Sequence, residues 1–323
     1  MVARPDHPGA VPRQSHSGAG DRAGGPDGVL LLDKPAGITS TRALARAKRL
    51  VGSLKGGHTG TLDPFATGLL PLVFGEATKF SRFLLDSRKA YQAVLRLGEE
   101  TPTGDTESAV SQRRPVAVDS ATIDEVLRTF LGAHTQIPPM HSAIHVAGRR
   151  LYDYARAGEE VERPTREVVI ESLERIAIEG SDLSISVACS KGTYIRTLAQ
   201  DIGLKLGCGA HLVGLRRTGV GGFDLGQAVT FETLDAEGPA RARERLLPPE
   251  ALVTALSRLD ATSEEADHFG HGRVFVREGE TGAEVAIYAP GGRFLGVARR
   301  AEAGRIVALR LMSPADAKAP VFA

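Results

Sequence analysis

The chain has 323 residues, of which 42% are hydrophobic and 24% are charged, and its formal net charge is +1. This composition is typical of a soluble globular protein, and the length is sufficient for one large domain with a small one, or for two medium domains. The sequence has no apolar run long enough to span a bilayer and no signal-peptide core, so we expect a cytoplasmic protein without a membrane partner. Its two cysteines are too few for a disulfide framework or a cysteine-based zinc site.

The first 27 residues are rich in Gly, Pro, Ser and Arg and show no hydrophobic periodicity, so residues 1–27 are predicted to form a disordered tail. An apolar strand is predicted over 28–33 and a turn over 34–37. Thr39 or Ser40 is expected to cap the helix that follows the turn. The ordered part of the chain is therefore expected to begin at residue 28.

The segment from Gly56 to Pro71 carries a single carboxylate, Asp63, in a run with almost no other charge. Glycines before Asp63 allow positive φ, and Pro64 removes a backbone donor and disfavours a helical conformation at Asp63. We therefore predict a rigid, non-helical loop that presents one acidic side chain. An isolated carboxylate beside apolar residues suits a catalytic nucleophile or base. The alternative, an Asx turn in which Asp63 bonds only its own backbone, is about equally favoured by the local chemistry.

Hydrophobic patterns predict two helices, a strand and a turn after this loop. A helix is predicted over 76–85, a half-buried strand over 90–97 and a tight turn over 101–105. Thr122 and Glu125 have the spacing of a capping box at the start of another helix. The strand carries Tyr91, and packing in a half-buried sheet is the simplest explanation for a tyrosine at such a position.

Residues 136–166 combine several arginines, including Arg149 and Arg150, with Tyr152 and Tyr154. Arginines neutralise phosphate charge and aromatic rings stack on bases, so this combination suits binding of nucleic acid. From composition alone, a solvated amphipathic helix is the simpler interpretation.

The last part of the chain is predicted to be rich in strands. Paired strands are predicted over 168–178 and 183–188, a helix over 193–206 and a further strand over 211–217. A domain boundary is predicted within 235–249, followed by β runs at 284–289, 293–299 and 305–312 with a hairpin turn at 290–292. Strands and helices do not alternate regularly, which argues against a doubly wound parallel sheet.

Three strings of residues carry a resemblance to a known family. They are Gly56-Gly57-His58-Thr59-Gly60-Thr61-Leu62-Asp63-Pro64, the 101–105 turn after the strand with Tyr91, and Ser190-Lys191-Gly192-Thr193-Tyr194-Ile195-Arg196. Together they closely resemble the motifs of the TruB family of pseudouridine synthases, which act on transfer RNA. The resemblance covers roughly residues 28–230 and is looser beyond them.

The resemblance implies an α+β fold with a mixed-sheet pseudouridine synthase catalytic domain over 28–247. A thumb-like RNA-binding insertion is implied over 136–166, and a small C-terminal PUA-like β module, which is an RNA-binding fold, over 248–323. The implied activity is conversion of uridine 55 in the T loop of transfer RNA to pseudouridine, through base flipping, cleavage of the glycosidic bond and reattachment at C5.

The resemblance also implies the residues of the site. Asp63 matches the catalytic aspartate of the family, Arg196 matches the arginine that pairs with it, and Tyr91 matches the aromatic residue placed against the target base. His58 is implied to lie against the RNA. Further contacts with the substrate are expected at Tyr194, Leu215, Lys34, Arg149 and Arg150.

The sequence shows no His/Cys cluster with metal-ligand spacing and no phosphate-binding loop, so we expect no metal and no cofactor. The expected partner is the T arm of transfer RNA, bound by a monomer without an obligatory protein partner. One alternative is a guide-dependent pseudouridine synthase, against which the long insertion argues. The other is an RNA-binding chaperone that folds transfer RNA. The intact set of Asp63, Tyr91 and Arg196 argues against a chaperone with a vestigial site.

Overall fold

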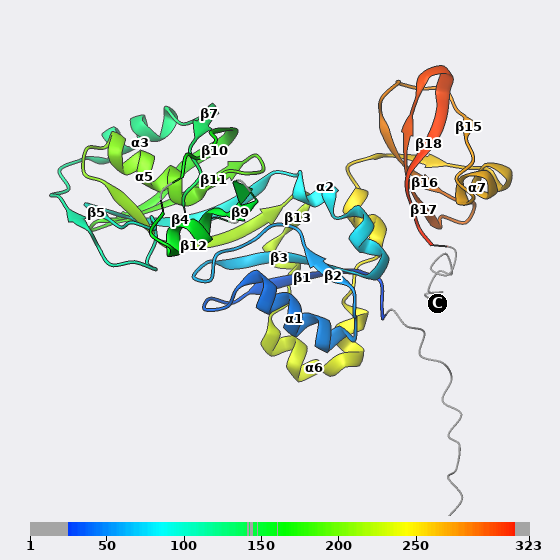
Figure 1. The fold of residues 1–323 in the computed structure, drawn as a ribbon, viewed down its shortest axis with the longest axis horizontal. Coiled ribbons are helices and arrows are strands. Elements are labelled where there is room, and N and C mark those ends of the chain that lie inside the picture. Colours follow the sequence, from blue (N-terminus) through cyan, green and yellow to red (C-terminus); the bar gives the residue numbers. More distant parts are fainter. Residues whose placement is uncertain (1–24, 141, 143–144, 147, 160, 314–323) are drawn as a thin grey trace, which may run out of the picture.

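The computed structural model of the chain describes residues 25–140, 142, 145–146, 148–159 and 161–313. Residues 1–24 of the predicted tail lie outside this range. Figure 1 shows a body built from a large sheet and helices, with a smaller β module beside it. In the described part of the chain, no helix is long and apolar enough to cross a membrane.

A mixed sheet forms the centre of the body. Its strands lie in the order β1-β3-β12-β4-β11-β10-β7, while β2 pairs with β3 and β13 pairs with β12. All neighbours are antiparallel except β3 and β12, which are parallel. The strands span Gly28–Lys34 (β1), Gly56–His58 (β2), Thr67–Phe74 (β3), Lys89–Leu97 (β4), Gly132–Gln136 (β7), Arg166–Glu179 (β10), Asp182–Cys189 (β11), Ala210–Val220 (β12) and Phe223–Asp224 (β13). The predicted α+β fold around a mixed sheet is confirmed.

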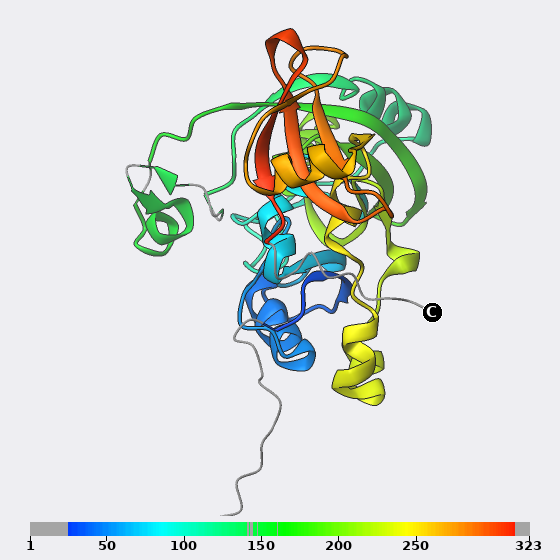
Figure 2. The same cartoon turned by 90° about the vertical axis from the view of Figure 1, so that its right-hand side faces the viewer.

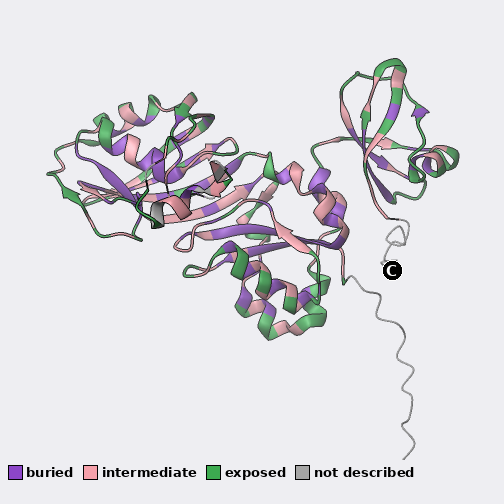
Figure 3. Cartoon of the chain, in the orientation of Figure 1, coloured by how far each residue is buried: buried purple, intermediate pink, exposed green. Residues whose placement is uncertain are grey.

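Helices cover the sheet in two groups (Figure 1). α1 (Ser40–Val51) and α6 (Phe231–Glu244) pack against each other beside β1, and α3 (Ser120–Arg128) and α5 (Ile195–Lys205) pack beside β10 and β12. One cluster of buried apolar side chains has members in both groups and in the sheet, and Figure 3 marks the buried residues of these elements in purple. The sheet and its helices therefore share a continuous core.

The segment 76–85, predicted as a single helix, forms the 3-10 helix η1 (Gly75–Phe80) and the one-turn helix α2 (Arg82–Leu85). Ala77 and Phe80 are three residues apart and are buried in the same apolar cluster. A spacing of three suits a 3-10 helix, in which residues i and i+3 lie on one side. The single-helix prediction is wrong, because the segment is divided at Ser81 into a 3-10 helix, with which the burial of this pair is compatible, and one α-helical turn.

Helix starts follow the capping chemistry, in one case at a different residue from the one predicted. Thr39 caps α1 as expected, since its Oγ1 accepts a hydrogen bond from Arg42 N at 3.1 Å. α3 is capped by Asp119, whose carboxylate accepts a hydrogen bond from Thr122 N at 2.7 Å. The predicted capping box of Thr122 and Glu125 is therefore wrong, because an acid three residues earlier takes the capping position.

Two further predictions are corrected by the structure. The loop predicted over 56–71 is shorter, because β2 and β3 take up both of its ends and only residues 59–66 join them. β3 is apolar along most of its length, which is the pattern of a strand covered on both faces. The segment predicted as a boundary, 235–249, is largely α6, which is interrupted by non-helical Gly238 (φ 79°) followed by Pro239.

The C-terminal module is a five-stranded sheet in the order β14-β16-β17-β18-β15, with one helix, α7 (Ser263–Gly270). Its strands span Ser257–Asp260 (β14), Phe275–Val276 (β15), Glu284–Tyr288 (β16), Phe294–Arg300 (β17) and Arg305–Leu311 (β18). The three predicted β runs are confirmed as β16, β17 and β18. Gly291 and Gly292 take positive φ in the turn between β16 and β17, where the hairpin was predicted.

The module packs directly on the body. Phe294 meets Phe80 edge-on with ring centroids 5.2 Å apart, and Arg82 forms an ion pair with Glu284 at 2.7 Å. The connecting 3-10 helix η3 (Pro249–Val253) packs against β1 and η1. The connection up to residue 253 therefore belongs to the packing of the body.

A segment between β7 and β10 projects away from the body (Figure 2). It contains β8 (His145–Val146), β9 (Arg149–Arg150) and α4 (Leu151–Arg156). The other short elements are β5 (Glu99–Glu100), β6 (Gln112–Arg113), η2 (Leu225–Gln227) and η4 (Glu302–Gly304).

Candidate active site

Segments that are far apart in the sequence line one cavity of about 280 Å³ in the body. The 59–66 loop contributes Asp63, β4 contributes Tyr91, the start of α5 contributes Arg196 and β12 contributes Leu215. The sheet explains this convergence, because β12 lies between β3, which follows the loop, and β4. The cavity thus brings together the three residues predicted to be catalytic.

The loop that carries Asp63 is tied to the chain around the start of α1. Ser40 Oγ donates a hydrogen bond to Leu62 O at 3.0 Å and accepts one from Leu62 N at 2.8 Å. Gly37 N donates to Pro64 O at 2.8 Å. These bonds fix the backbone on both sides of Asp63.

Asp63 forms an ion pair with Arg196. Arg196 Nε lies 3.1 Å from Asp63 Oδ2, and Arg196 Nη2 donates to Asp63 Oδ1 at 3.4 Å, so two nitrogens of the guanidinium face the carboxylate. The side chain of Asp63 keeps 33% of its surface exposed, whereas that of Arg196 keeps 5%. The carboxylate is open to the cavity on one side and held by a buried cation on the other. This geometry favours the catalytic interpretation of Asp63 over the Asx turn.

A second carboxylate holds the other side of Arg196. Asp105 Oδ2 lies 3.5 Å from Arg196 Nη1, and the Asp105 side chain is 1% exposed. Thr103 Oγ1 donates to Asp105 Oδ1 at 2.6 Å, and Glu107 N donates to the same atom at 2.9 Å. Arg196 therefore lies between two carboxylates, and the 101–105 turn helps to orient it.

The environment changes the acidity of Asp63. Burial raises the pKa of Asp63 above that of an ordinary aspartate, the charge of Arg196 opposes the rise, and the charge of Asp105 adds to it. Asp63 therefore takes up its proton at a higher pH than an exposed aspartate. Once ionised, it is a stronger base than an exposed aspartate.

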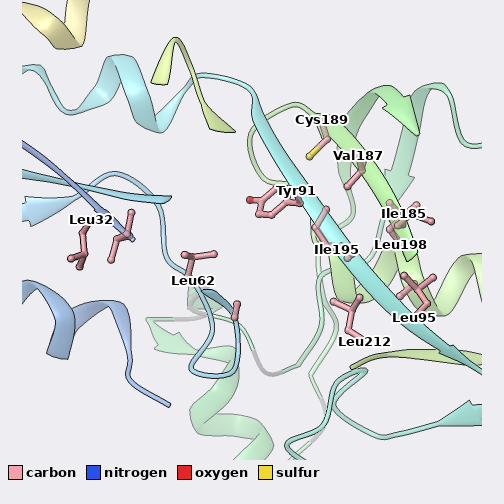
Figure 4. Packing of buried hydrophobic residues seen from close by; sticks show 14 of the residues in the cluster. Leu32, Leu62, Tyr91, Leu95, Ile185, Val187, Cys189, Ile195, Leu198 and Leu212 are labelled. Carbon is pink, nitrogen blue, oxygen red and sulfur yellow. The ribbon is translucent and has the colours of Figure 1, made fainter. Parts of the chain in front are cut away.

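Tyr91 lies on β4 opposite Val187 of β11, and its ring is buried beside Val187 and Cys189 (Figure 4). Burial raises the pKa of Tyr91, and the positive charge of Arg217 opposes that rise. The phenol is therefore neutral at pH 7, and it can both donate and accept a hydrogen bond.

His58 ends β2, two residues before Gly60 of the cavity lining, and does not itself line the cavity. Burial lowers the pKa of His58, and the charge of Arg217 lowers it further, so the imidazole is neutral at pH 7. Its Nδ1 is buried and has no hydrogen-bond partner among the residues that the structure describes.

Lys34, predicted to contact the substrate, is fully buried at the end of β1. Its ammonium donates to Ile38 O at 2.8 Å, to Pro35 O at 2.9 Å and to Pro64 O at 3.4 Å. Burial lowers the pKa of Lys34 to about 8. Its contacts thus join the backbone after β1, at Pro35 and Ile38, to Pro64 of the catalytic loop.

The other predicted substrate contacts fall in two places. Tyr194 and Leu215 line the cavity. Arg149 lies on the projecting segment, where its guanidinium stacks over the Tyr154 ring at 4.4 Å and pairs with Glu159 at 3.0 Å. Arg150 belongs to β9, and its side chain lies outside the described part of the structure.

Sequence reasoning missed Arg217, Lys89 and Asp105. Arg217 and Lys89 line the cavity, and Asp105 forms an ion pair with Arg196 at 3.5 Å. A signal for two of them was available: Lys89 is two positions before Tyr91 and Arg217 is two positions after Leu215, so each shares a strand face with a predicted site residue. Asp105 lies in the 101–105 string, which we interpreted as a turn that matches a family motif, without giving its carboxylate a role.

Comparisons with known proteins place this geometry in a family. Successive parts of the chain match three family models: TruB family pseudouridylate synthase (N terminal domain) over 48–195, tRNA pseudouridylate synthase B C-terminal domain over 196–254, and Pseudouridine synthase II TruB, C-terminal over 259–312. A protein of Azoarcus sp. (strain BH72) named tRNA pseudouridine synthase B is 52% identical over 84% of this chain and 90% of its own length. The chain belongs to the TruB family of pseudouridine synthases.

Further relatives agree with this membership of the TruB family. A protein of Dechloromonas aromatica (strain RCB), also named tRNA pseudouridine synthase B, is 50% identical over 90% of this chain and 97% of its own length. A crystal structure of a Cbf5-Nop10-Gar1 complex is similar in fold, with a TM-score of 0.70 and 26% identity, and covers 91% of this chain and 87% of the chain compared. The TruB-type fold therefore extends over both the body and the module.

Proposed function

We propose that this chain is a tRNA pseudouridine synthase that isomerises uridine 55 in the T loop of transfer RNA. The observation that carries the proposal is the Asp63–Arg196 ion pair at a cavity that also holds Tyr91. Relatives named tRNA pseudouridine synthase B support transfer RNA as the substrate. The choice of uridine 55 rests on the family resemblance of the motifs.

The proposed reaction breaks the N1–C1′ bond of uridine, turns the detached uracil and joins its C5 to C1′. Asp63 is the single carboxylate among the described residues that line the cavity. Attack on C1′, attack on C6 and stabilisation of an oxocarbenium-like sugar all require an ionised carboxylate, and Arg196 holds Asp63 in position for each of them. Tyr91 supplies a flat ring against which the uracil is retained and a hydroxyl for proton transfer.

The target base is stacked in a folded loop, so it must leave the stack to enter the cavity. We assign Tyr194 and Leu215 to the walls that hold the flipped base, and the flat neutral ring of His58 to the place it vacates. Arg149 and Arg150 are assigned to phosphate contacts, which position RNA without reading its sequence.

We place the domain boundary at residues 254–256. The catalytic domain then spans 28–253, with the thumb-like insertion at 136–166, and a PUA-like module follows. The packing of η3 on β1 and η1 supports this division, and so do the family matches, which end at 254 and resume at 259. We propose a cytoplasmic monomer that needs no protein partner.

Similarity to the Cbf5-Nop10-Gar1 complex makes a guide-dependent synthase the second candidate. Formation of pseudouridine releases the hydrogen on C5 of uridine, so a transcript of transfer RNA tritiated at uridine C5 reports the reaction. We expect tritium release with the purified chain alone. Release that requires guide RNA and added proteins would support the guide-dependent enzyme. Faster folding of the transcript without any release would support a chaperone.

Removal of divalent metal ions should leave the chemistry unchanged. Among the described residues, no group of three or more His, Cys, Asp or Glu side chains could hold a metal ion. We expect the same single-turnover rate with EDTA as without it, and no requirement for an added cofactor. A matched experiment on a short T-arm RNA controls for folding of the RNA, and loss of activity on that RNA, restored by a divalent ion, would contradict this prediction.

Removal of residues 257–323 should weaken RNA binding more than it slows the bound chemical step. The module carries Arg305 and Arg310 on β18, whose charges add affinity that falls with salt. We expect a higher dissociation constant with a flatter salt dependence. We expect a single-turnover rate at saturating enzyme within about tenfold of the full chain, which is about 1.4 kcal/mol of barrier. The cut lies after η3, so that the packing of η3 on the body is kept.

Two outcomes of this truncation would contradict the prediction. One is a folded truncation that binds RNA as tightly as the full chain. The other is a truncation that binds normally but does not react, which would mean that the module completes the active site. Such an effect would have a structural basis, because Phe294 of the module packs on Phe80. The residues that follow Phe80 in the chain include Leu85 and Lys89, which line the cavity.

Activity should fall with decreasing pH as Asp63 becomes protonated. Because burial raises the pKa of Asp63, the acid limb of the rate profile should have its midpoint above the ordinary value of about 3.9. Asp105→Asn removes a negative charge that raises this pKa, so the limb should move to lower pH. Single-turnover rates at saturating enzyme over the pH range in which the protein stays folded test this. A limb that stays in place or moves to higher pH would count against it.

A further inference from the structure

Arg217 is a buried cation that the proposed chemistry has not used. It lies on β12 with 1% of its surface exposed. In the described part of the chain, its guanidinium donates to backbone carbonyls and lies near the hydroxyl of Tyr91, with no carboxylate among these partners. Burying a charge without a counter-ion is costly, and hydrogen bonds offset only part of the cost. A buried charge of this kind beside the reacting groups indicates a functional role for Arg217.

The guanidinium of Arg217 binds the start of the catalytic loop and the strand that follows the loop. Arg217 Nη2 donates to Gly60 O at 3.1 Å and Nη1 lies 3.5 Å from Thr61 O, just before Asp63. Nε donates to Leu69 O at 2.7 Å, on the strand that follows the loop. The backbone of Arg217 is fixed as well, because a Cβ at Gly68 (φ 101°) would lie only 2.3 Å from Arg217 O.

Arg217 is also the cross-strand neighbour of Tyr91. In the register of β12 and β4, Arg217 lies opposite Tyr91, and its guanidinium is placed to hydrogen-bond the Tyr91 hydroxyl. A guanidinium has donors and no acceptor, so the phenolic oxygen accepts this bond. The proton of the phenol is then directed away from Arg217, and Tyr91 itself lines the cavity.

We propose that Arg217 is a positioning residue that turns Tyr91 into a hydrogen-bond donor to the nucleotide held in the cavity and fixes that hydroxyl relative to the loop of Asp63. The inference rests on the proposed uridine isomerisation, in which the cavity holds the flipped base. It assigns Tyr91 a polarity: its hydroxyl donates to an oxygen of the bound nucleotide, because the contact with Arg217 turns the phenolic proton away from the guanidinium.

The charges around Tyr91 agree with this role. Arg217 from β12, Cys189 from β11 and Asp63 from the loop act on the phenol. Burial raises the pKa of the Cys189 thiol to about 11, so this neighbour is neutral at pH 7. Arg217 is then the cation that makes the phenol a better donor, because it opposes the effect of burial on Tyr91.

A double-mutant cycle separates this role from simple support of the loop. Arg217→Lys keeps a charge but loses the fork that reaches the loop and the hydroxyl together. We expect it to lower the single-turnover rate at saturating enzyme by at least about thirtyfold, but by less than about threefold when Tyr91→Phe is already present. Arg96→Lys is the matched control, because Arg96 lies on the same strand as Tyr91, pairs with Asp182 and is absent from the cavity lining. Equal losses in both backgrounds, or no loss at all, would overturn the proposal.

A second measurement needs no RNA and therefore stands apart from the proposed function. The ultraviolet absorbance of tyrosinate is titrated in the protein and in its Tyr91→Phe counterpart, and the difference reports Tyr91 alone. Arg217→Met removes the charge and should move this titration to higher pH, with thermal unfolding as the check that each variant is folded. If Arg217→Met does not fold, the titration is made with Arg217→Lys, in which the shift should be smaller but in the same direction. An unchanged titration would refute the contact, whereas an inactive wild-type chain with the expected shift would refute only the proposed function.

Discussion

Asp63→Asn should abolish turnover while leaving RNA binding nearly unchanged. The amide keeps the shape of the side chain but loses the charge and the nucleophilicity that every route through Asp63 requires. We expect the single-turnover rate at saturating enzyme to fall at least about a thousandfold, which is about 4 kcal/mol of barrier. Binding should persist, because Asp63 is one small group in a large RNA interface.

The fold should also tolerate Asp63→Asn. The raised pKa of Asp63 shows that its ionised form is disfavoured by burial, and the substitution removes that cost. Arg196 keeps Asp105 at 3.5 Å and Thr103 O at 3.4 Å as partners. Asp124→Asn is the matched control, since it removes an aspartate paired with Arg175 at 2.8 Å outside the cavity lining. Activity of Asp63→Asn within tenfold of the wild type would remove Asp63 from its proposed role.

Arg196→Lys should lower the rate by at least about a hundredfold, which is about 2.7 kcal/mol of barrier. The Arg196 guanidinium contacts Asp63 with two nitrogens and Asp105 with a third. A lysine ammonium is a single point charge on a flexible stem and cannot hold both carboxylates in this geometry. Asp63 would lose its fixed rotamer and part of the charge that keeps it ionised.

Arg196→Lys should also change the pH dependence of the rate. Because the Arg196 charge opposes the raised pKa of Asp63, a less well-placed charge should move the acid limb of the rate profile to higher pH. Arg175→Lys is the control, since Arg175 also holds an aspartate with two nitrogens, each at 2.8 Å, but does not line the cavity. Normal activity of Arg196→Lys would show that the ion pair with Asp63 is not important.

The sequence allowed prediction of the elements whose pattern is local. The strand with Tyr91, the helix start at Thr39 and the last three strands follow from periodicity, capping and turn residues. The spacing of motifs, read through the family resemblance, pointed to Asp63, Tyr91 and Arg196, and the structure brings these three to one cavity.

What could not be predicted depends on packing between distant segments. The 3-10 helix η1 places Phe80 against Phe294, more than 200 residues later in the chain, and no local pattern indicates that contact. Lys34 was predicted to contact the substrate, and only the folded loop shows that its ammonium is buried among carbonyls. Arg217 has an ordinary sequence context, and its importance becomes visible only when β12 lies between the loop strand β3 and the strand of Tyr91.

Position-resolved detection of pseudouridine in an unmodified transcript of transfer RNA tests the central claim most directly. The transcript is incubated with the full chain or with its Asp63→Asn variant, without guide RNA or other proteins. We predict pseudouridine at position 55 alone with the wild-type chain and none with the variant. Pseudouridine formed equally by the variant, or formed at other positions with uridine 55 unchanged, would contradict the account.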